Sequence, residues 1–313
     1  MKNNQIIEYF FDCTYKCVPP TKPKMKLMVL CGYNAISKKT LLCCFILLQN
    51  EKEFTFKKIF EYLRDNYSFN PPKIMCDFRL SQINACKNIF PNCLIHCCFF
   101  HFSQCIWNKF KKYNMCGKGT YKENYTLLFN IQLMCFMKRE YINNFFKDLK
   151  KKYKNVKFKN FFQYFATTWL GEKYPKKIWN YNDLILEENA LKKFLFTNNI
   201  TENINRYLNY ELKMSKCSST LFKKIILNII AQFDTKNFNE DKKNRKSDLL
   251  KFYIQKNYNN ISVLSNDDIE SLKIIYEDIE FKNINIDFCE NNNCDYDIID
   301  FGDNSEDEKD EII

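Results

Sequence analysis

Residues 9–15 are YFFDCTY, a short apolar and aromatic run with one acid, Asp12, in its middle. Aromatic side chains are typical of strands, so residues 6–18 are predicted to form a strand around this acid. A second acid, Asp77, ends the apolar run 73–77, which is also predicted to be a strand. Carboxylates that converge on apolar strands are the oxygen ligands that Mg²⁺ prefers. The two runs therefore predict a sheet that carries a metal site.

The segments around these two runs complete an α/β pattern. Short apolar runs predict strands, and apolar positions at helical spacing predict helices. Beyond residues 6–18, the predicted elements are strands at 25–34, 40–48, 73–77 and 93–98 and helices at 54–67 and 81–90. Ser81 is predicted to be the N-cap of the second helix. This order predicts three antiparallel strands and then two parallel strands joined by helical crossovers, which resembles the ribonuclease H-like fold.

The rest of the chain is predicted to be helical as far as about Gln232, with breaks at Gly117, Gly119, Gly171 and Pro175. We expect a core at 1–98, a helical insertion at 99–196, completion of the core at 197–233, a linker with further helices at 234–286, and a disordered acidic tail at 287–313.

The formal charge of +11 is unevenly distributed along the chain. Residues 287–313 hold eleven acidic residues against the single lysine Lys309, which is a net charge of −10. Residues 1–286 therefore carry +21, a field that attracts polyanions such as nucleic acid. The alternative is that the lysines of residues 1–286 only lie on solvated helix faces. Net charge alone does not decide between this alternative and binding to nucleic acid.

The sequence favours an intracellular protein that is not secreted. No signal peptide opens the chain, and the longest apolar run of its first half, residues 41–48, is too short to span a bilayer. The sixteen cysteines are expected in a reducing compartment, as small buried side chains or metal ligands rather than disulfides.

A third acid, Glu202, completes a spaced set of carboxylates that suggests a two-metal nucleotidyl-transfer site. Each acid also has a structural alternative. Asp12 could face solvent on an edge strand, and Asp77 could cap the helix that follows it. Glu202 could instead accept a hydrogen bond from a free N–H group at the start of a helix that Asn199 caps, since the two residues have the spacing of a capping box.

The stretches around these acids resemble the catalytic domain of Mutator-like element transposases. The resemblance covers residues 6 to about 215 and rests on 12–16, 77–85, 90–91, 98–104, 165–170, 179–180 and 197–202. It implies a ribonuclease H-like core with a helical insertion between the second and third acids. Asp12, Asp77 and Glu202 fall on the Asp-Asp-Glu triad of the family, which implies two Mg²⁺ or Mn²⁺ ions and in-line displacement at phosphorus.

The chain also departs from the family pattern. Cys13 stands where glycine is common, Phe196 where arginine is common, and Asn203 and Ile204 where glycine and an aromatic residue often follow the glutamate. Relatives usually carry a zinc-binding DNA-recognition module before the first acid, whereas eleven residues precede Asp12 here. We expect from this a truncated copy, a fragment of a gene or a derivative retained by a host.

Cys98 and His101 form the Cys-x-x-His element that the family has near its active site. His101 either contacts the scissile DNA or orients a catalytic carboxylate, or it is a buried residue that packs the insertion against the sheet. Zinc held by Cys93, Cys97, Cys98, His101 and Cys105 is the rival hypothesis. Alternation points Cys97 and Cys98 to opposite faces of a strand, and no second Cys-x-x-Cys pair is present, so structural zinc is not expected.

A lysine-rich segment, residues 147–159, is a candidate for phosphate contacts, with Lys150, Lys151 and Lys152 as its candidates. Its interleaved aromatic residues are equally typical of an amphipathic helix pair with a solvated face. Arg206, one turn beyond Glu202, is a further candidate for the DNA backbone. Trp169 and Trp179 are predicted to be core residues.

These observations predict a transposase catalytic domain that cleaves and joins DNA strands in the nucleus or cytoplasm, with double-stranded DNA as partner and no membrane. Self-association into a homo-oligomer is left open. The first alternative is a catalytically lapsed or domesticated relic that binds DNA or protein. The second is a ribonuclease H-like nuclease unrelated to transposition, which would cleave RNA–DNA hybrids or structured DNA without strand transfer.

Overall fold

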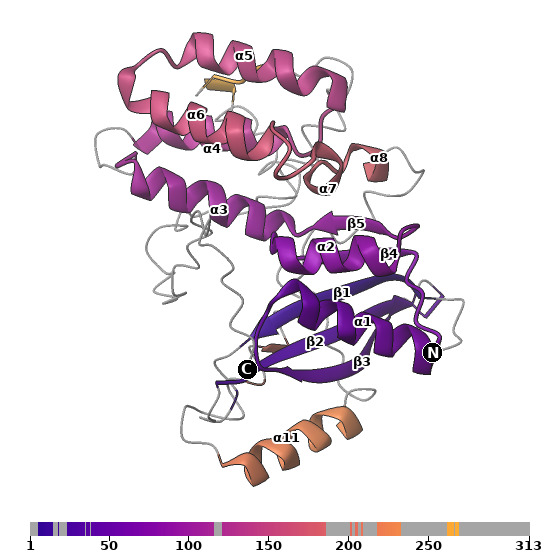
Figure 1. Cartoon of the computed structure of the whole chain (residues 1–313). Helices are drawn as coiled ribbons and strands as arrows, with labels where there is room; N and C mark the ends of the chain where they lie inside the picture. The colour runs from indigo at the N-terminus through magenta and orange to yellow at the C-terminus, as the bar shows by residue number, and fades with distance from the viewer. Residues whose placement is uncertain are drawn as a thin grey trace, which may run out of the picture.

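The computed structural model contains one mixed sheet of five strands among its described residues (Figure 1). It describes residues 6–14, 18, 24–34, 36–37, 39–115, 121–185, 201, 204–205, 208, 218–232, 262–265 and 267–268. The strands are β1 (Ile6–Thr14), β2 (Lys26–Asn34), β3 (Lys39–Leu48), β4 (Lys73–Cys76) and β5 (Leu94–Cys97). Their order in the sheet is β3-β2-β1-β4-β5, so β1 is the central strand.

The directions of the strands confirm the predicted α/β class and the mixed sheet. β1, β2 and β3 pair antiparallel. β4 runs parallel to β1, and β5 runs parallel to β4. As a result, the carboxyl ends of β1, β3, β4 and β5 and the start of β2 meet at one edge of the sheet.

Two helices cover one face of the sheet, α1 (Glu53–Tyr67) and α2 (Leu80–Ile89) (Figure 1). Phe56, Phe60 and Leu63 form the buried stripe of α1. They belong to a large core cluster that also includes Phe11 of β1. The observed bounds of α1 and α2 agree with the predicted helices at 54–67 and 81–90 to within one residue.

The predicted cap of α2 is wrong. The N-cap residue of α2 is Arg79, whose side chain makes no capping hydrogen bond. Ser81 lies inside the helix, and its hydroxyl donates instead to the main-chain oxygen of Glu51, 2.7 Å away. The nearby loop after β3 competes for this hydroxyl, which local sequence could not reveal.

The opposite face of the sheet carries a second, smaller core. Phe10 of β1, Val29 of β2 and Met75 of β4 pack there with Phe222 and Ile229 of α11 (Ser219–Gln232). Ile204 and Leu208 belong to the same cluster. Odd and even positions of β1 thus point to different cores, as the period of two requires.

A set of helices continues from β5 and packs beside the sheet (Figure 1). These are α3 (Phe99–Lys112), α4 (Tyr121–Leu133), the 3₁₀ turn η1 (Arg139–Tyr141), α5 (Ile142–Lys152), α6 (Val156–Trp169), α7 (Lys176–Trp179) and α8 (Asn182–Ile185). Trp169 and Trp179 are fully buried among them, which confirms their predicted place in the core. The predicted division into domains stays a prediction.

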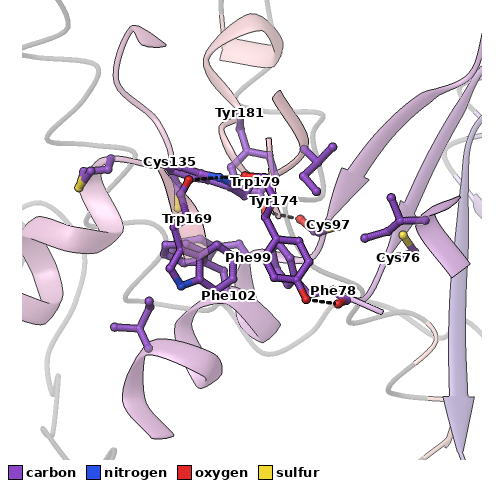
Figure 2. Packing of buried hydrophobic residues seen from close by; sticks show 14 of the residues in the cluster. Cys76, Phe78, Cys97, Phe99, Phe102, Cys135, Trp169, Tyr174, Trp179 and Tyr181 are labelled. Carbon is purple, nitrogen blue, oxygen red and sulfur yellow. Dashed lines mark hydrogen bonds between the residues drawn. The ribbon is translucent and has the colours of Figure 1, made fainter. Parts of the chain in front are cut away.

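Two tyrosines tie these helices to the sheet (Figure 2). The Tyr174 hydroxyl donates to the main-chain oxygen of Phe78, 2.8 Å away, just beyond β4. The Tyr181 hydroxyl donates to the main-chain oxygen of Cys97, the last residue of β5. Both bonds are made at the edge where β4 and β5 end.

An extended piece of the chain near the carboxyl terminus docks on the helices. Asn130 of α4 donates to the main-chain oxygen of Leu264 and accepts from its N–H, at 3.0 and 2.8 Å. The first part of the predicted linker region, residues 234–261, and the predicted tail at 287–313 lie outside the described residues. None of the described helices is long and apolar enough to cross a bilayer.

A buried ion pair joins β1 to β4 at the other end of the sheet. Lys73 Nζ lies 3.3 Å from Glu8 Oε1, and both side chains are at least nine-tenths buried. Burial raises the pKa of Glu8 to about 7, although the charge of Lys73 and its hydrogen bond to the carboxylate oppose this. The folded chain therefore binds the Glu8 proton more tightly than the unfolded chain does.

The double variant Glu8→Gln/Lys73→Met is expected to lose less stability than wild type as the pH rises from 4.5 to about 7. A raised carboxyl pKa contributes stability that is complete below pH 4.5 and lost as the pH rises to about 7, worth about 3 kcal/mol. Removing both partners avoids an unpaired buried charge. Chemical denaturation at a series of pH values measures this, and an unchanged slope between pH 4.5 and 7 would contradict it.

Candidate active site

Asp12 lies on β1, and Asp77 is the first residue after the neighbouring parallel strand β4. β1 and β4 pair Phe10 with Met75, and the same register continued by two residues pairs Asp12 with Asp77. Paired residues project from the same face of a sheet, and adjacent strands lie about 4.8 Å apart. The backbone thus brings both acids to one corner of the sheet, at the carboxyl ends of β1 and β4.

Asp12 is a buried acid of the central strand, so the alternative of a solvent-facing edge residue is wrong. Its residue is 8% exposed. The N–H of Cys13 donates to Oδ1 at 2.9 Å, and Asn205 Nδ2 donates to Oδ2 at 2.6 Å. Two donors that are fixed in this way stabilise the ionised carboxylate and set its orientation.

Asn205 is a site residue that the sequence analysis missed. It lies 193 positions from Asp12 in the chain, and its only sequence signal is its place three residues after Glu202. Thr201, Ile204, Asn205 and Leu208 are all buried, at the spacing of one helix face. Glu202 and Arg206 lie outside the described residues.

Asp77 pairs with His101, whose Nδ1 lies 2.9 Å from Asp77 Oδ1. The Asp77 side chain is 15% exposed and that of His101 is 22% exposed. Asp77 does not cap α2, because the N-cap is Arg79. Of the three roles that the sequence left open for His101, the contact with Asp77 favours orientation of a carboxylate over packing alone.

The electrostatics of this pair favour its charged form. Burial opposes the charged imidazole, yet the Asp77 carboxylate and the nearby Cys98 raise the pKa of His101 well above its usual value. Burial also opposes the Asp77 carboxylate, but His101 and then Arg79 hold the pKa of Asp77 below its usual value. At neutral pH the pair is therefore an imidazolium and a carboxylate.

The two histidines of the chain are expected to titrate on opposite sides of pH 6.5. Burial and then the charges of Lys73 and Arg139 lower the pKa of His96 to about 3. In metal-free protein, NMR should show one imidazole that stays neutral near pH 6 and one, His101, that stays charged above pH 6.5.

Variants assign and test these signals. His101→Gln should remove the signal that titrates at high pH, and Asp77→Asn should lower its midpoint because the carboxylate that opposes the effect of burial is then lost. A wild-type His101 that titrates at or below pH 6.5 would contradict the ion pair.

The cysteines near this corner divide between the two faces of the sheet. Cys97 packs in the large core and Cys98 in the smaller one, as strand alternation predicted. Cys97 Sγ donates to the main-chain oxygen of Asp77 at 3.5 Å. Within the described ranges, no group of three or more His, Cys, Asp or Glu side chains is arranged to hold a metal ion, and Glu202 lies outside these ranges. The expectation that the chain holds no structural zinc therefore stays a prediction.

The lysine-rich segment forms an amphipathic helix pair, α5 and α6. Its aromatic residues Phe145, Phe146, Tyr153 and Phe158 are buried, so they pack the core and do not stack on bases. Lys150, Lys151 and Lys152 are exposed. Lys151 pairs with Asp148 at 3.1 Å, and Lys152 Nζ donates to the main-chain oxygen of Leu264 at 2.8 Å.

Comparison with known proteins supports the predicted family. Residues 9–105 match the family model described as MULE transposase domain, where MULE denotes Mutator-like element. The matched segment begins in β1 and ends in α3, and it includes Asp12, Asp77, Cys98 and His101. No curated protein matches the chain. The predicted resemblance is therefore confirmed, and residues 9–105 are consistent with a MULE transposase domain.

Proposed function

We propose that the chain is a DDE-type transposase catalytic domain that cleaves DNA strands and joins them to new sites. The observation that carries the proposal is the register of β1 and β4, which pairs Phe10 with Met75 and, continued by two residues, sets Asp77 just after β4 opposite Asp12. Nucleotidyl transfer needs carboxylates that converge on one point, and neighbouring parallel strands supply such a point. The match of residues 9–105 to the MULE transposase domain supports the same function.

The proposed fold is ribonuclease H-like. Its support is the strand order β3-β2-β1-β4-β5, with the first acid on the central strand and the second directly after β4. Helices α1 and α2 on one face and α11 on the other complete a three-layer arrangement. In this proposal α3 to α8 form the insertion between the second and third acids.

The residues present fit a divalent metal. Asp12 and Asp77 offer hard carboxylate oxygens, which suit Mg²⁺ or Mn²⁺. We propose Glu202 as the third ligand, since Asn205, three residues further along the chain, donates to Asp12. Two bound ions would supply the charge that activates a water or a 3′-hydroxyl and stabilises the leaving oxygen.

The neighbouring residues have supporting roles in this proposal. Asn205 and the N–H of Cys13 hold the Asp12 carboxylate in one orientation. His101 holds one oxygen of Asp77 and leaves the other for a ligand. Such outer contacts commonly change metal affinity or activity by roughly 10- to 100-fold when they are removed.

We propose double-stranded DNA as the partner and the nucleus as the place of action. The charge of +21 on residues 1–286 favours binding to a polyanion. Lys150 and Lys151 are the exposed candidates on α5, whereas the contact of Lys152 with Leu264 makes it a weaker one. Arg206 stays a candidate from the sequence.

Cleavage of short DNA duplexes in Mg²⁺ or Mn²⁺ tests this function. We expect nicking that stops with a chelator and with Glu202→Gln, together with joined strand-transfer products. Nicking should be unchanged in the partly exposed control Glu53→Gln. Cleavage of RNA–DNA hybrids without strand transfer would indicate a ribonuclease H-like nuclease instead. No cleavage of any substrate would favour the catalytically lapsed relic.

A further inference from the structure

A buried glutamate, Glu51, gathers two cations at the edge of the sheet that carries Asp12 and Asp77. It lies between β3 and α1, and its side chain is 7% exposed. Its Oε2 accepts a hydrogen bond from Arg79 at 2.7 Å and pairs with Lys26, the first residue of β2. Neither the sequence motifs nor the proposed function uses this cluster.

Arg79 is the member of this cluster that bears on the proposed site. It follows Asp77 by two residues, and its charge lowers the pKa of the Asp77 carboxyl after the larger effects of burial and His101. A guanidinium has five donors and pairs readily with a carboxylate through two parallel bonds. An Arg79 that was free to move would therefore compete with a metal ion for the oxygens of Asp77.

Glu51 also holds the chain that connects Asp77 to α2. Its main-chain oxygen accepts from Ser81 at 2.7 Å, while its side chain holds Arg79. The same connection is also held by Tyr174, whose hydroxyl donates to the main-chain oxygen of Phe78. The guanidinium of Arg79 is thus held by Glu51. The chain on either side of Arg79 is held through the hydrogen bonds of Phe78 and Ser81.

The second oxygen of Glu51 argues against a purely stabilising role. Oε1 is buried without a hydrogen-bond partner among the residues that the structure describes. A buried acceptor without a partner destabilises the fold. A carboxylate kept at such a cost calls for an explanation other than stability, and its pairing with Arg79 beside a candidate metal ligand supplies one.

We propose that Glu51 is a positioning residue of the active site, which holds the Arg79 guanidinium away from Asp77 and so keeps that carboxylate available to a divalent metal. This role rests on the proposed function. It assigns Glu51 no contact with metal or DNA. Its effect is on the affinity for metal, through Arg79.

Titration calorimetry with Mn²⁺ alone tests the role. Glu51→Gln keeps the shape of the side chain but removes the charge that restrains Arg79, and we expect Mn²⁺ affinity to fall roughly 10- to 100-fold. The double variant Glu51→Gln/Arg79→Gln removes the competing guanidinium, and we expect it to recover affinity to within a few-fold of wild type. Glu53→Gln, the same change at a partly exposed acid on α1, is the matched control.

The outcomes separate the two proposals. If wild type and Glu53→Gln bind Mn²⁺ but Glu51→Gln binds it equally well, the role of Glu51 is overturned and the proposed function stands. If the double variant binds as weakly as the single one, Glu51 is a structural anchor and the role is again overturned. If wild type shows no Mn²⁺ binding that depends on Asp77, the proposed function fails, and the role of Glu51 fails with it. Should Glu51→Gln not fold, the double variant still tests the role, because without the guanidinium it should bind Mn²⁺ to within a few-fold of wild type. Much weaker binding by the folded double variant would overturn the role.

Discussion

Asp77→Asn is expected to lower metal-dependent DNA cleavage by more than about 100-fold, beyond the 10- to 100-fold typical of changes in outer contacts. The amide has the size of the carboxylate but lacks its charge, so it binds a divalent cation poorly. The fold should survive, because Asp77 lies directly after β4 and its main-chain oxygen still accepts from Cys97. Single-turnover nicking of a labelled duplex measures the effect.

The controls for this prediction separate metal binding from damage to the fold. Asp183→Asn, which changes an exposed acid on α8 paired with Arg139, should nick at the wild-type rate. Circular dichroism should show the same helix content in both variants. Wild-type nicking by a folded Asp77→Asn variant would remove Asp77 from the set of ligands.

Trp179→Ala is expected to destabilise the chain more than any other single change to a side chain of the helical part. Trp179 is fully buried, and its indole N–H donates to the main-chain oxygens of Trp169 at 3.2 Å and Tyr174 at 3.1 Å. Its ring stacks on Phe102 with the centroids 5.6 Å apart. Removal of a buried tryptophan costs about 3–5 kcal/mol, which corresponds to a fall in Tm of roughly 10 °C for a domain of this size.

Two further variants divide this effect into its parts. Trp179→Phe keeps most of the ring but leaves two carbonyl oxygens without their donor, at about 1–3 kcal/mol. Trp107→Ala removes a partly exposed ring of α3 and should cost less than Trp179→Ala. Thermal denaturation that places Trp179→Ala within 2 °C of wild type, about half a kcal/mol, would contradict the packing described for Trp179.

The sequence predicted the parts of the fold that depend on local pattern. The alternation in β1 separates Phe10 and Phe11 between two cores, and the run 73–77 identifies the strand that ends before Asp77. Once both are strands of one parallel pair, the register places Asp12 and Asp77 at the same edge of the sheet. The same alternation correctly separated Cys97 from Cys98.

The contacts that complete the site depend on residues far apart in the chain, so no local pattern could reveal them. Asn205 reaches Asp12 across 193 positions, and Arg79 reaches Glu51 across 28. Ser81 has the residue type of an N-cap, but its hydroxyl bonds to Glu51 because the loop after β3 lies beside α2. Propensity gave the right helix and the wrong cap, since tertiary contacts decide where a short polar side chain donates.

Calorimetric titration of Mn²⁺ in the presence of a short DNA duplex tests most directly whether Asp12 and Asp77 together form a metal site. We expect saturable binding to wild type and at least about 10-fold weaker binding to Asp12→Asn and to Asp77→Asn, with melting temperatures that show both variants to be folded. Equal affinity in wild type and in both folded variants would contradict a metal site at the ends of β1 and β4.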